Sequence, residues 1–394
     1  MDQMLAEFWQ NPSSVHRPGQ QARHRVELAR KQLAGLIGAR PRQITLCGSG
    51  TEAIDLAIRG SLLAQGRVGG ARRREPGAII TSKVEHVGVR DLAGALEKEE
   101  GARTLWAELD GAGRVRAESV RELLAAHSDV ALVSIQWANN ETGVVHPVRE
   151  IGAICRERGV PFHTDATQWV GKVRVEEGVE GSRHQGIKGG TESAALDAFD
   201  LLTFSPHKFH GPKGVGVLYC RPGVRTSPLI HGEQEQGRRG GTENVPGIVG
   251  AGVAAELAMA WLAEPSNIAK GRTMRDRFER TVLTGVPDAV VNGIGPGVER
   301  LWNTSSIGFS RLEAEALLLL LSERGVCASA GAACASGSLE PSPVLRAMGI
   351  PAEVAHGTLR FSVSRETTTE EIEQAARIVM ECVARLRASM SAVS

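Results

Sequence analysis

Apolar residues along the chain follow two alternating spacings. Val26, Ala29, Leu33, Leu36 and Ile37 recur at helical spacing and predict one buried helix face. Short β-rich apolar runs predict strands over residues 44–48, 78–82, 130–135, 160–166, 199–205 and 215–220. Helical patterns separate most of these runs, which predicts an α/β fold with helices on both faces of a mostly parallel sheet. An active site is then expected beyond the carboxyl ends of the strands.

The pattern changes near residue 263, where a smaller mixed unit begins. Its predicted elements are strands over 303–309 and 358–364, a helix over 313–325 and a long amphipathic helix from Thr369. We therefore expect a large domain over residues 1–262 and a smaller α+β domain over residues 263–394. A surface insertion is expected near residues 171–196, which are rich in glycine and charge.

Composition and charge narrow the class of function. The 394 residues are 42% hydrophobic, enough for a large core, and the net charge of +1 provides no general attraction for nucleic acid or an anionic membrane. The first ten residues contain no apolar signal region, and we expect no membrane span and a cytoplasmic location. The six cysteines lack CxxC and Cys/His ligand spacing, so we predict neither a metal site nor a disulfide framework.

Three predicted strand ends carry residues with chemical potential. The first strand runs into Gly48-Ser49-Gly50-Thr51 and a helix, a turn whose free N–H groups suit a phosphate, although Thr51 could simply cap the helix. Asp165 ends another strand, where a turn residue is the ordinary interpretation. Lys208 follows a third, where a solvated surface lysine is the ordinary interpretation.

Together, a phosphate cradle, a carboxylate and an amine are the set that pyridoxal 5'-phosphate (PLP) requires. At these residues the sequence resembles the cysteine desulfurases of the class V aminotransferase group, of the NifS/IscS-like type. The resemblance runs nearly end to end and implies the type I fold of PLP-dependent transferases. It rests on the ordered motifs NPSSVHRPGQQAR (11–23), SGTEA (49–53), TSKVEH (81–86), NNETGVV (139–145), HTDATQ (163–168), SPHKFHGPKGVG (205–216), GRRGGTENV (237–245), CASGSLEPSPVLRAMG (334–349) and LRFSVSR (359–365).

The resemblance implies roles at the cofactor ring. Lys208 would bind PLP covalently and later move protons, and Asp165 would pair with the pyridine nitrogen. His86 would stack on the ring and act as an acid and base; without the resemblance, a polar residue at a helix start is the simpler interpretation. Gln168 and Asn140 would bond the phenolic oxygen.

The resemblance also implies residues for the phosphate and the substrate. The phosphate would be held by Gly50, Thr51, Ser205, His207 and, from a neighbouring subunit of a homodimer, Thr242. Arg360 would clamp the substrate carboxylate, helped by Asn303 and Asn140, although Arg360 alone reads as an ordinary strand-end arginine. A bidentate guanidinium supplies both charge and orientation.

Cys334 determines which reaction this site would serve. It lies among small residues, AGAACASGSLEP, where a thiol can be exposed, whereas Cys155 and Cys382 lie in apolar periodic segments. The implied reaction converts L-cysteine to L-alanine and leaves the sulfur on Cys334 as a persulfide. The sulfur would pass to a scaffold protein for iron–sulfur clusters or to a carrier for thiolation.

The chain departs from the family pattern in places. It begins after the family's first strand and its Asn/Ala/Thr-rich segment, and Ala330 and Ala332 replace the usual serines. Lys188, in the 171–196 insertion, is a rival lysine without a strand end to aim it. Two alternatives stay open: another class V PLP enzyme, an aminotransferase or selenocysteine lyase, or a truncated, weakly catalytic sulfur-relay or scaffold-binding subunit.

Overall fold

The computed structural model describes residues 1–66, 77–175, 194–331 and 340–391. The chain divides into two compact units. Unit 1 comprises Met1–Glu108, Ala117–Trp137 and Pro147–Glu264, and unit 2 comprises Leu109–Arg116, Ala138–His146 and Pro265–Ser394. The sequence-based division into residues 1–262 and 263–394 does not separate the two short segments that belong to unit 2. Asn140 is therefore a residue of unit 2.

Unit 1 is built on a seven-stranded sheet in the order β1-β7-β6-β5-β4-β2-β3. The strands are β1 Ile44–Cys47, β2 Ala78–Ser82, β3 Arg103–Ala107, β4 Val130–Ser134, β5 Phe162–Asp165, β6 Leu201–Phe204 and β7 Gly216–Cys220. Strands β2 to β6 pair in parallel, and β7 is antiparallel to both of its neighbours. The predicted α/β class with a mostly parallel sheet is confirmed. The prediction lacked β3, a partly exposed edge strand without a continuous apolar run.

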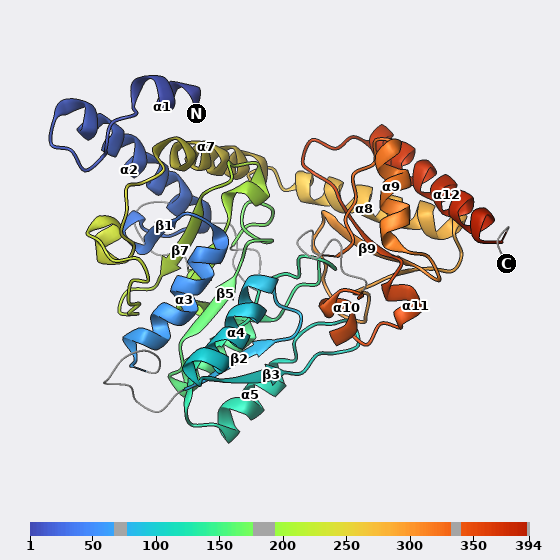
Figure 1. Ribbon diagram of the computed structural model, residues 1–394, viewed down its shortest axis with the longest axis horizontal. Helices are drawn as coiled ribbons and strands as arrows, with labels where there is room; N and C mark the ends of the chain where they lie inside the picture. The colour runs from blue at the N-terminus through green and yellow to red at the C-terminus, as the bar shows by residue number, and fades with distance from the viewer. Residues whose placement is uncertain (67–76, 176–193, 332–339, 392–394) are drawn as a thin grey trace. The chain divides into compact units, whose positions relative to one another are not determined.

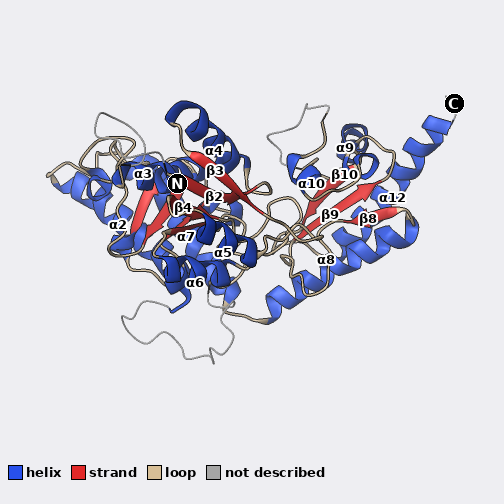
Figure 2. Ribbon diagram, turned by 90° about the horizontal axis from the view of Figure 1, so that it is seen from below, coloured by secondary structure: helices blue, strands red, loops and turns tan. Residues whose placement is uncertain are grey.

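Helices cover both faces of this sheet. They are α1 Asp2–Glu7, α2 Arg17–Ile37, α3 Gly50–Ala64, α4 Val87–Glu100, α5 Ala117–Ala126, α6 Val148–Arg158 and α7 Val245–Leu262. Figure 2 shows α3 and α4 on one side of the strands and α5 and α6 on the other. Short 3-10 turns complete the unit: η1 Pro41–Gln43, η2 Ala194–Ala198, η3 Pro206–Phe209 and η4 Gln234–Gly237. One core cluster joins the apolar faces of α3 and α4 to the sheet.

Helix α2 has the face that the sequence predicts. Val26, Ala29, Leu33, Leu36 and Ile37 are all buried, and α2 lies along α7 (Figure 1). Helix α7 has a mean hydropathy of 1.6 over 18 residues and is long and apolar enough to cross a membrane by length and composition. The expectation that no stretch of the chain approaches the length needed to span a bilayer is therefore wrong for α7. Half of α7 is buried in unit 1, as in the core helix of a globular protein.

Unit 2 is a three-stranded antiparallel sheet with helices on it, in the strand order β10-β9-β8. The strands are β8 Ala289–Val291, β9 Thr304–Phe309 and β10 Thr358–Ser362, and the helices are α8 Ser266–Gly285, α9 Ala314–Glu323, α10 Pro343–Ala347, α11 Ala352–Ala355 and α12 Thr369–Ser391. Phe278 of α8, Ile307 of β9 and Phe361 of β10 belong to one buried cluster with α12. Figure 1 shows α8, α9 and α12 gathered beside β9.

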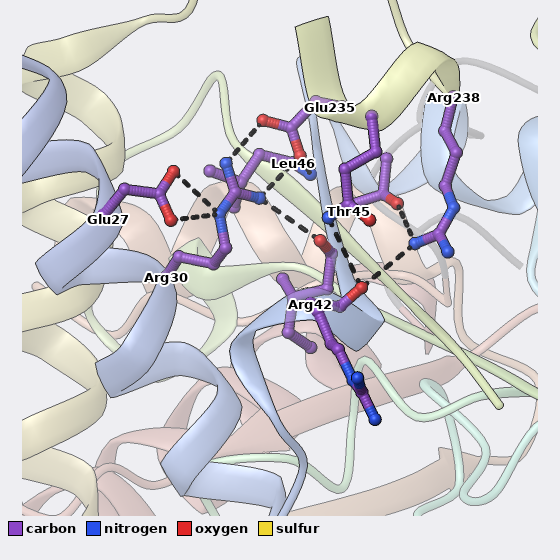
Figure 3. A network of polar contacts seen from close by, with 9 residues as sticks. Glu27, Arg30, Arg42, Thr45, Leu46, Glu235 and Arg238 are labelled. Atoms are coloured by element: carbon purple, nitrogen blue, oxygen red, sulfur yellow. Dashed lines mark hydrogen bonds and ion pairs between the residues drawn. The ribbon is translucent and has the colours of Figure 1, made fainter. Parts of the chain in front are cut away.

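A buried ion pair joins three parts of unit 1 (Figure 3). Arg30 of α2 donates from Nη1 to Glu235 Oε2 (2.6 Å) and from Nη2 to Glu235 Oε1 (2.8 Å). Leu46 of β1 donates its backbone N–H to Glu235 Oε2 (2.8 Å), and Arg30 also donates to the Ile44 carbonyl. Burial lowers the pKa of Arg30, but the bond and charge of Glu235 outweigh it, so the net shift is upward. The pair thus fixes η4 onto α2 and β1.

This pair holds strained backbone in place. Glu235 and Gln236 both have positive φ, 51° and 60°, in the left-handed region that non-glycine residues rarely adopt. Three residues on, Arg239 bonds Glu52 in the first turn of α3 (2.7 Å), and Glu52 accepts from the Gly48 N–H (2.8 Å). The loop that carries Thr242 is therefore tied to α2, β1 and the start of α3.

Replacing Glu235 by Gln should destabilise unit 1 by about 3 kcal/mol, because Arg30 would stay buried without its counter-charge. The matched control is Glu233→Gln, two residues earlier and exposed, which should change stability by less than about 0.5 kcal/mol. Urea denaturation followed by circular dichroism measures both. Equal shifts in the two variants would contradict a structural role for the pair.

Two buried histidines make the stability of the folded chain depend on pH. Burial lowers the pKa of His163, which lies between Ser134 (2.8 Å) and Thr203 (3.0 Å), to about 3, and burial does the same for His146 of unit 2. Between pH 6.5 and pH 3 the unfolded chain therefore binds more protons than the folded chain, so stability falls as the pH is lowered through this window. Urea midpoints measured from pH 7 to pH 4 should fall. The fall should be shallower for His163→Gln, and an unchanged slope would contradict the assignment.

Candidate active site at the strand ends of unit 1

All strands of the unit 1 sheet except β7 bring their carboxyl ends to one edge. β2, β4, β5 and β6 run in parallel, and β1, antiparallel to β7, runs in the same direction as they do. Asp165 is the last residue of β5, and the residues that follow the other ends include Gly50, His86, Ser205 and Lys208. All five were predicted from the sequence. This edge is where ligands bind in open α/β sheets.

The turn after β1 forms a cradle at the start of α3. Ser49 caps the helix, since its Oγ accepts from the Glu52 N–H (3.0 Å), so the alternative that Thr51 is the cap is wrong. A Cβ placed on Gly50 would lie 2.7 Å from Ser205 Oγ and 4.0 Å from Thr167 Oγ1. Only glycine therefore fits, and two hydroxyls lie beside the free N–H groups of a helix start. Such a site suits a phosphate, and Thr167 is a member that the sequence interpretation missed.

Positive charge surrounds the turn after β6. Lys208 and His207 are exposed on η3, and the Lys208 N–H bonds the Ser205 carbonyl (3.0 Å). Burial, together with the charges of Lys208, Lys213 and Lys172, lowers the pKa of His207. A dianionic group near His207 would be attracted by the same charges.

His86 lies at the start of α4, and the charges of Asp165 and Lys208, both predicted to bind the cofactor, act on it. Its Nδ1 accepts from the Gly88 N–H (3.1 Å), so a neutral imidazole carries its proton on Nε2. Burial lowers the pKa of His86; Asp165 opposes that shift and Lys208 adds to it. His86 thus caps the helix, as the simpler interpretation holds, and also interacts electrostatically with Asp165 and Lys208.

Asp165 and Gln168 are held by local bonds. Asp165 is buried, and its Oδ1 accepts from the Thr167 N–H (3.0 Å). Its backbone carbonyl accepts from Trp137 N–H at the exit of β4 (2.9 Å). Gln168 Oε1 accepts from Lys172 Nζ (2.5 Å), which assigns the amide oxygen to that lysine. The carboxylate is therefore fixed at the strand end rather than solvated.

Glu85, beside His86, is a buried residue that the sequence interpretation missed. Its carboxyl group accepts from the Gln136 N–H (3.0 and 3.1 Å) and from Ser82 Oγ (2.8 Å). Burial raises the pKa of Glu85 to about 8, and Asp165 acts in the same direction. The residue locks the turn before His86 onto the end of β4. Its local sequence, an acid three residues after β2 and next to a histidine, does not distinguish a buried residue from a solvated one.

Unit 2 contains the residues predicted to face the substrate. Arg360 of β10 donates from Nη1 to the Asn140 carbonyl (2.8 Å), so the structure brings these two together. The side-chain Oδ1 of Asn140 is buried without a partner among the described residues, which suits a residue that bonds a ligand. Asn303, with Ser305 and Phe361, lines a cavity of about 580 Å³ within unit 2.

Cys334 lies outside the described residues. Of the five described cysteines, Cys327 is exposed and the others are buried. Burial raises the pKa of Cys220 to about 11 and raises those of Cys47 and Cys155 as well. These three thiols are therefore poor nucleophiles at neutral pH.

The chain matches known proteins over nearly its whole length. The model of the aminotransferase class-V family matches residues 1–177 and 194–375. A cysteine desulfurase of Trichormus azollae is 45% identical over 385 residues, covering 98% of this chain and 88% of that protein. Cysteine desulfurase NifS of Azotobacter vinelandii is 42% identical, covering 97% of this chain and 88% of that protein.

Solved structures give the same result. A NifS-like protein superposes with a TM-score of 0.82 at 30% identity, covering 98% of this chain and 94% of that chain. SspA in complex with cysteine superposes with a TM-score of 0.74 at 30% identity, covering 93% and 94%. The chain therefore belongs to the class-V aminotransferase family and, within it, to the NifS-like cysteine desulfurases.

Proposed function

We propose that the protein is a PLP-dependent cysteine desulfurase that converts L-cysteine to L-alanine and takes the sulfur on Cys334 as a persulfide. The observation that carries the proposal is the donor set on one sheet edge of unit 1: the amine of Lys208, the buried carboxylate of Asp165 and the cradle between Gly50 and Ser205. The relatives at 42–45% identity support cysteine as the substrate.

The residues present fit PLP. The helix-start N–H groups near Gly50 and Thr51, with Ser205 and His207, would hold the phosphate. Asp165 would keep the pyridine nitrogen protonated, and Gln168 and Asn140 would bond the phenolic oxygen. When bound through Lys208, PLP supplies an electron-withdrawing ring that stabilises negative charge on the substrate's α-carbon.

Proton transfer and substrate binding fall to residues of the chain. The lowered pKa of His86 keeps its imidazole neutral at pH 7, so Nε2 can exchange a proton. Lys208 Nζ would move the proton at the α-carbon. Arg360, with Asn303, would hold the substrate carboxylate. The Cys334 sulfur would then bond to the substrate sulfur as the substrate's C–S bond breaks. The released β-carbon would gain one proton and become the methyl group of alanine, which balances the proton that the Cys334 thiol loses.

A homodimer belongs to the same proposal. Thr242 is exposed on a loop that Glu235 and Arg239 fix in place, as expected of a residue that reaches a neighbouring subunit's phosphate. Val253 and Leu257 of α7 and Leu28 of α2 expose 48%, 54% and 41% of their surface, an apolar face that a second copy would cover.

The sulfur acceptor and the compartment are proposed from chemistry. An enzyme-bound persulfide requires a second thiol or a cluster scaffold to take its sulfur, so we infer an acceptor protein for iron–sulfur cluster assembly or thiolation. All five described cysteines are free thiols, as expected in a reducing cytoplasm.

Removing the two reactive side chains should separate cofactor binding from sulfur transfer. Lys208→Ala should abolish the borohydride-reducible absorbance of bound PLP and all alanine formation, because the covalent link is lost. Cys334→Ser should keep the cofactor spectrum and lose at least about 100-fold in alanine and sulfide formation with a thiol reductant. Alanine formed without a keto-acid acceptor also distinguishes a desulfurase from an aminotransferase. Undiminished turnover of Cys334→Ser would contradict the proposal.

Thr242→Ala should weaken PLP binding about 10-fold, because one hydrogen bond to the charged phosphate is lost. Thr284→Ala, an exposed helix residue of unit 2 whose hydroxyl bonds only the Arg280 carbonyl among the contacts described, is the control and should leave PLP affinity unchanged. Fluorescence titration of the apoprotein measures both, with the oligomeric state followed by light scattering. A monomer with wild-type PLP affinity would contradict the shared site.

A further inference from the structure

Arg360 is linked to two other segments of unit 2. Its backbone pairs with Ser329 in both directions, Arg360 N–H to Ser329 O (2.7 Å) and Ser329 N–H to Arg360 O (3.1 Å). Its guanidinium bonds the Asn140 carbonyl (2.8 Å). The predicted carboxylate-binding residue is therefore joined directly to the chain just before Gly331 and to the turn that begins at Asn139.

That turn fixes the direction of Glu141. The Asn139 Oδ1 accepts from the N–H groups of Glu141 (2.9 Å) and Thr142 (2.8 Å) and from Thr142 Oγ1 (3.1 Å). Gly143 follows with a φ of 76°, which closes the turn. Asn139, Glu141 and Thr142 are buried and Asn140 is half-buried, so Glu141 has a defined position.

The Glu141 carboxylate lies where two distant parts of the chain meet. Glu141 is 3% exposed, and its Oε2 accepts from Ser342 Oγ (2.6 Å). Ser342 Oγ also accepts from the Val344 N–H (3.1 Å) and so caps α10. A Cβ placed on Gly331 would lie 2.9 Å from Glu141 Oε2 and 3.2 Å from Ser342 Cβ, and Gly331 has a φ of 60°. Only glycine fits there without displacing the carboxylate.

Gly331 and Ser342 precede and follow the segment that contains Cys334. We propose that Glu141 is a positioning residue that holds both ends of this segment next to Arg360, and so sets the point from which Cys334 reaches the substrate. This inference rests on the proposed function for the role of Cys334. It assigns Glu141 and Ser342 to the sulfur-transfer step, although neither would touch the reacting atoms.

Chain geometry explains why the anchor matters. Cys334 is three residues after Gly331, and three residues span at most about 11 Å. Fixing Gly331 therefore restricts the volume that the thiol can occupy, which raises its effective concentration at the substrate. Glu141 also acts on Arg360: burial lowers the pKa of the guanidinium, and the charge of Glu141 opposes that shift. The Glu141 carboxylate thus acts on Arg360, which is predicted to bind the substrate, and on Gly331 and Ser342, which lie on either side of the segment that contains Cys334.

The test measures the two steps separately in the holoenzyme. Single-turnover alanine formation reports sulfur transfer, and the cysteine-induced change in the visible spectrum, recorded in a Cys334→Ser background, reports cysteine binding. Ser342→Ala should slow alanine formation about 10-fold and change the Kd for cysteine by less than about 2-fold. Ser342→Thr keeps the hydroxyl and should retain the wild-type rate. Glu353→Gln, an exposed carboxylate of unit 2, is the control.

A double variant tests whether the two side chains act as one. Glu141→Ala should slow alanine formation at least as much as Ser342→Ala, and adding Ser342→Ala to it should cause little further loss, because the shared bond is already gone. The proposal is overturned if the two losses multiply fully, if Ser342→Thr is as slow as Ser342→Ala, or if Ser342→Ala weakens cysteine binding as much as it slows turnover.

Hydrogen exchange gives a readout that does not depend on activity. In Glu141→Ala holoenzyme without cysteine, peptides covering residues 326–331 and 340–347 should exchange at least about 10-fold faster, while peptides from β9 stay unchanged. Unchanged exchange would contradict the anchor. If the wild-type enzyme forms no alanine, the proposed function fails, but the exchange result still decides whether Glu141 holds the segment.

Discussion

The parallel pairing of β2, β4, β5 and β6 is the constraint on which the candidate site of unit 1 depends. Each of these strands is only four or five residues long, yet their hydrogen bonds bring residues far apart in sequence to one edge. The position of Asp165 at this edge follows from that register, and the close approach of Gly50 to Ser205 follows from the antiparallel pairing of β7 with β1 and β6. A slip of one residue in β5 would turn Asp165 to the opposite face of the sheet.

Buried carboxyl groups hold loops and turns in place around this frame. Glu235 holds strained backbone with an arginine and a strand N–H, Glu85 joins the turn before His86 to the exit of β4, and Glu141 meets Gly331 and Ser342 in unit 2. Each accepts hydrogen bonds that offset part of the free-energy cost of removing the group from water. A carboxyl group suits this task because its two oxygens can form hydrogen bonds with several partners at once, so one side chain can fix two or three segments.

Residues at strand ends were predictable because position and chemistry coincide in the sequence. Asp165 and Ser205 end apolar runs, Lys208 follows one, and the small-residue turn over residues 48–51 already indicated a helix start that suits a phosphate. Glu85, Thr167 and Glu141 carried no comparable signal. Glu235 also carried no signal in the local sequence, because its partner Arg30 lies 205 residues away. A charged residue in a polar stretch has the same local pattern whether it is solvated or buried against a distant partner.

Periodicity in the sequence by itself determined the α/β class, most strand positions, the helix face of α2 and the change of architecture near residue 263, because burial imposes a local repeat on helices and strands. The ordered motifs determined the family. Only the tertiary structure decided that Ser49 rather than Thr51 caps α3, that Asn140 and its turn belong to unit 2, and that Gly331 and Ser342 meet at Glu141. These outcomes depend on contacts between residues far apart in the chain, which no local pattern encodes.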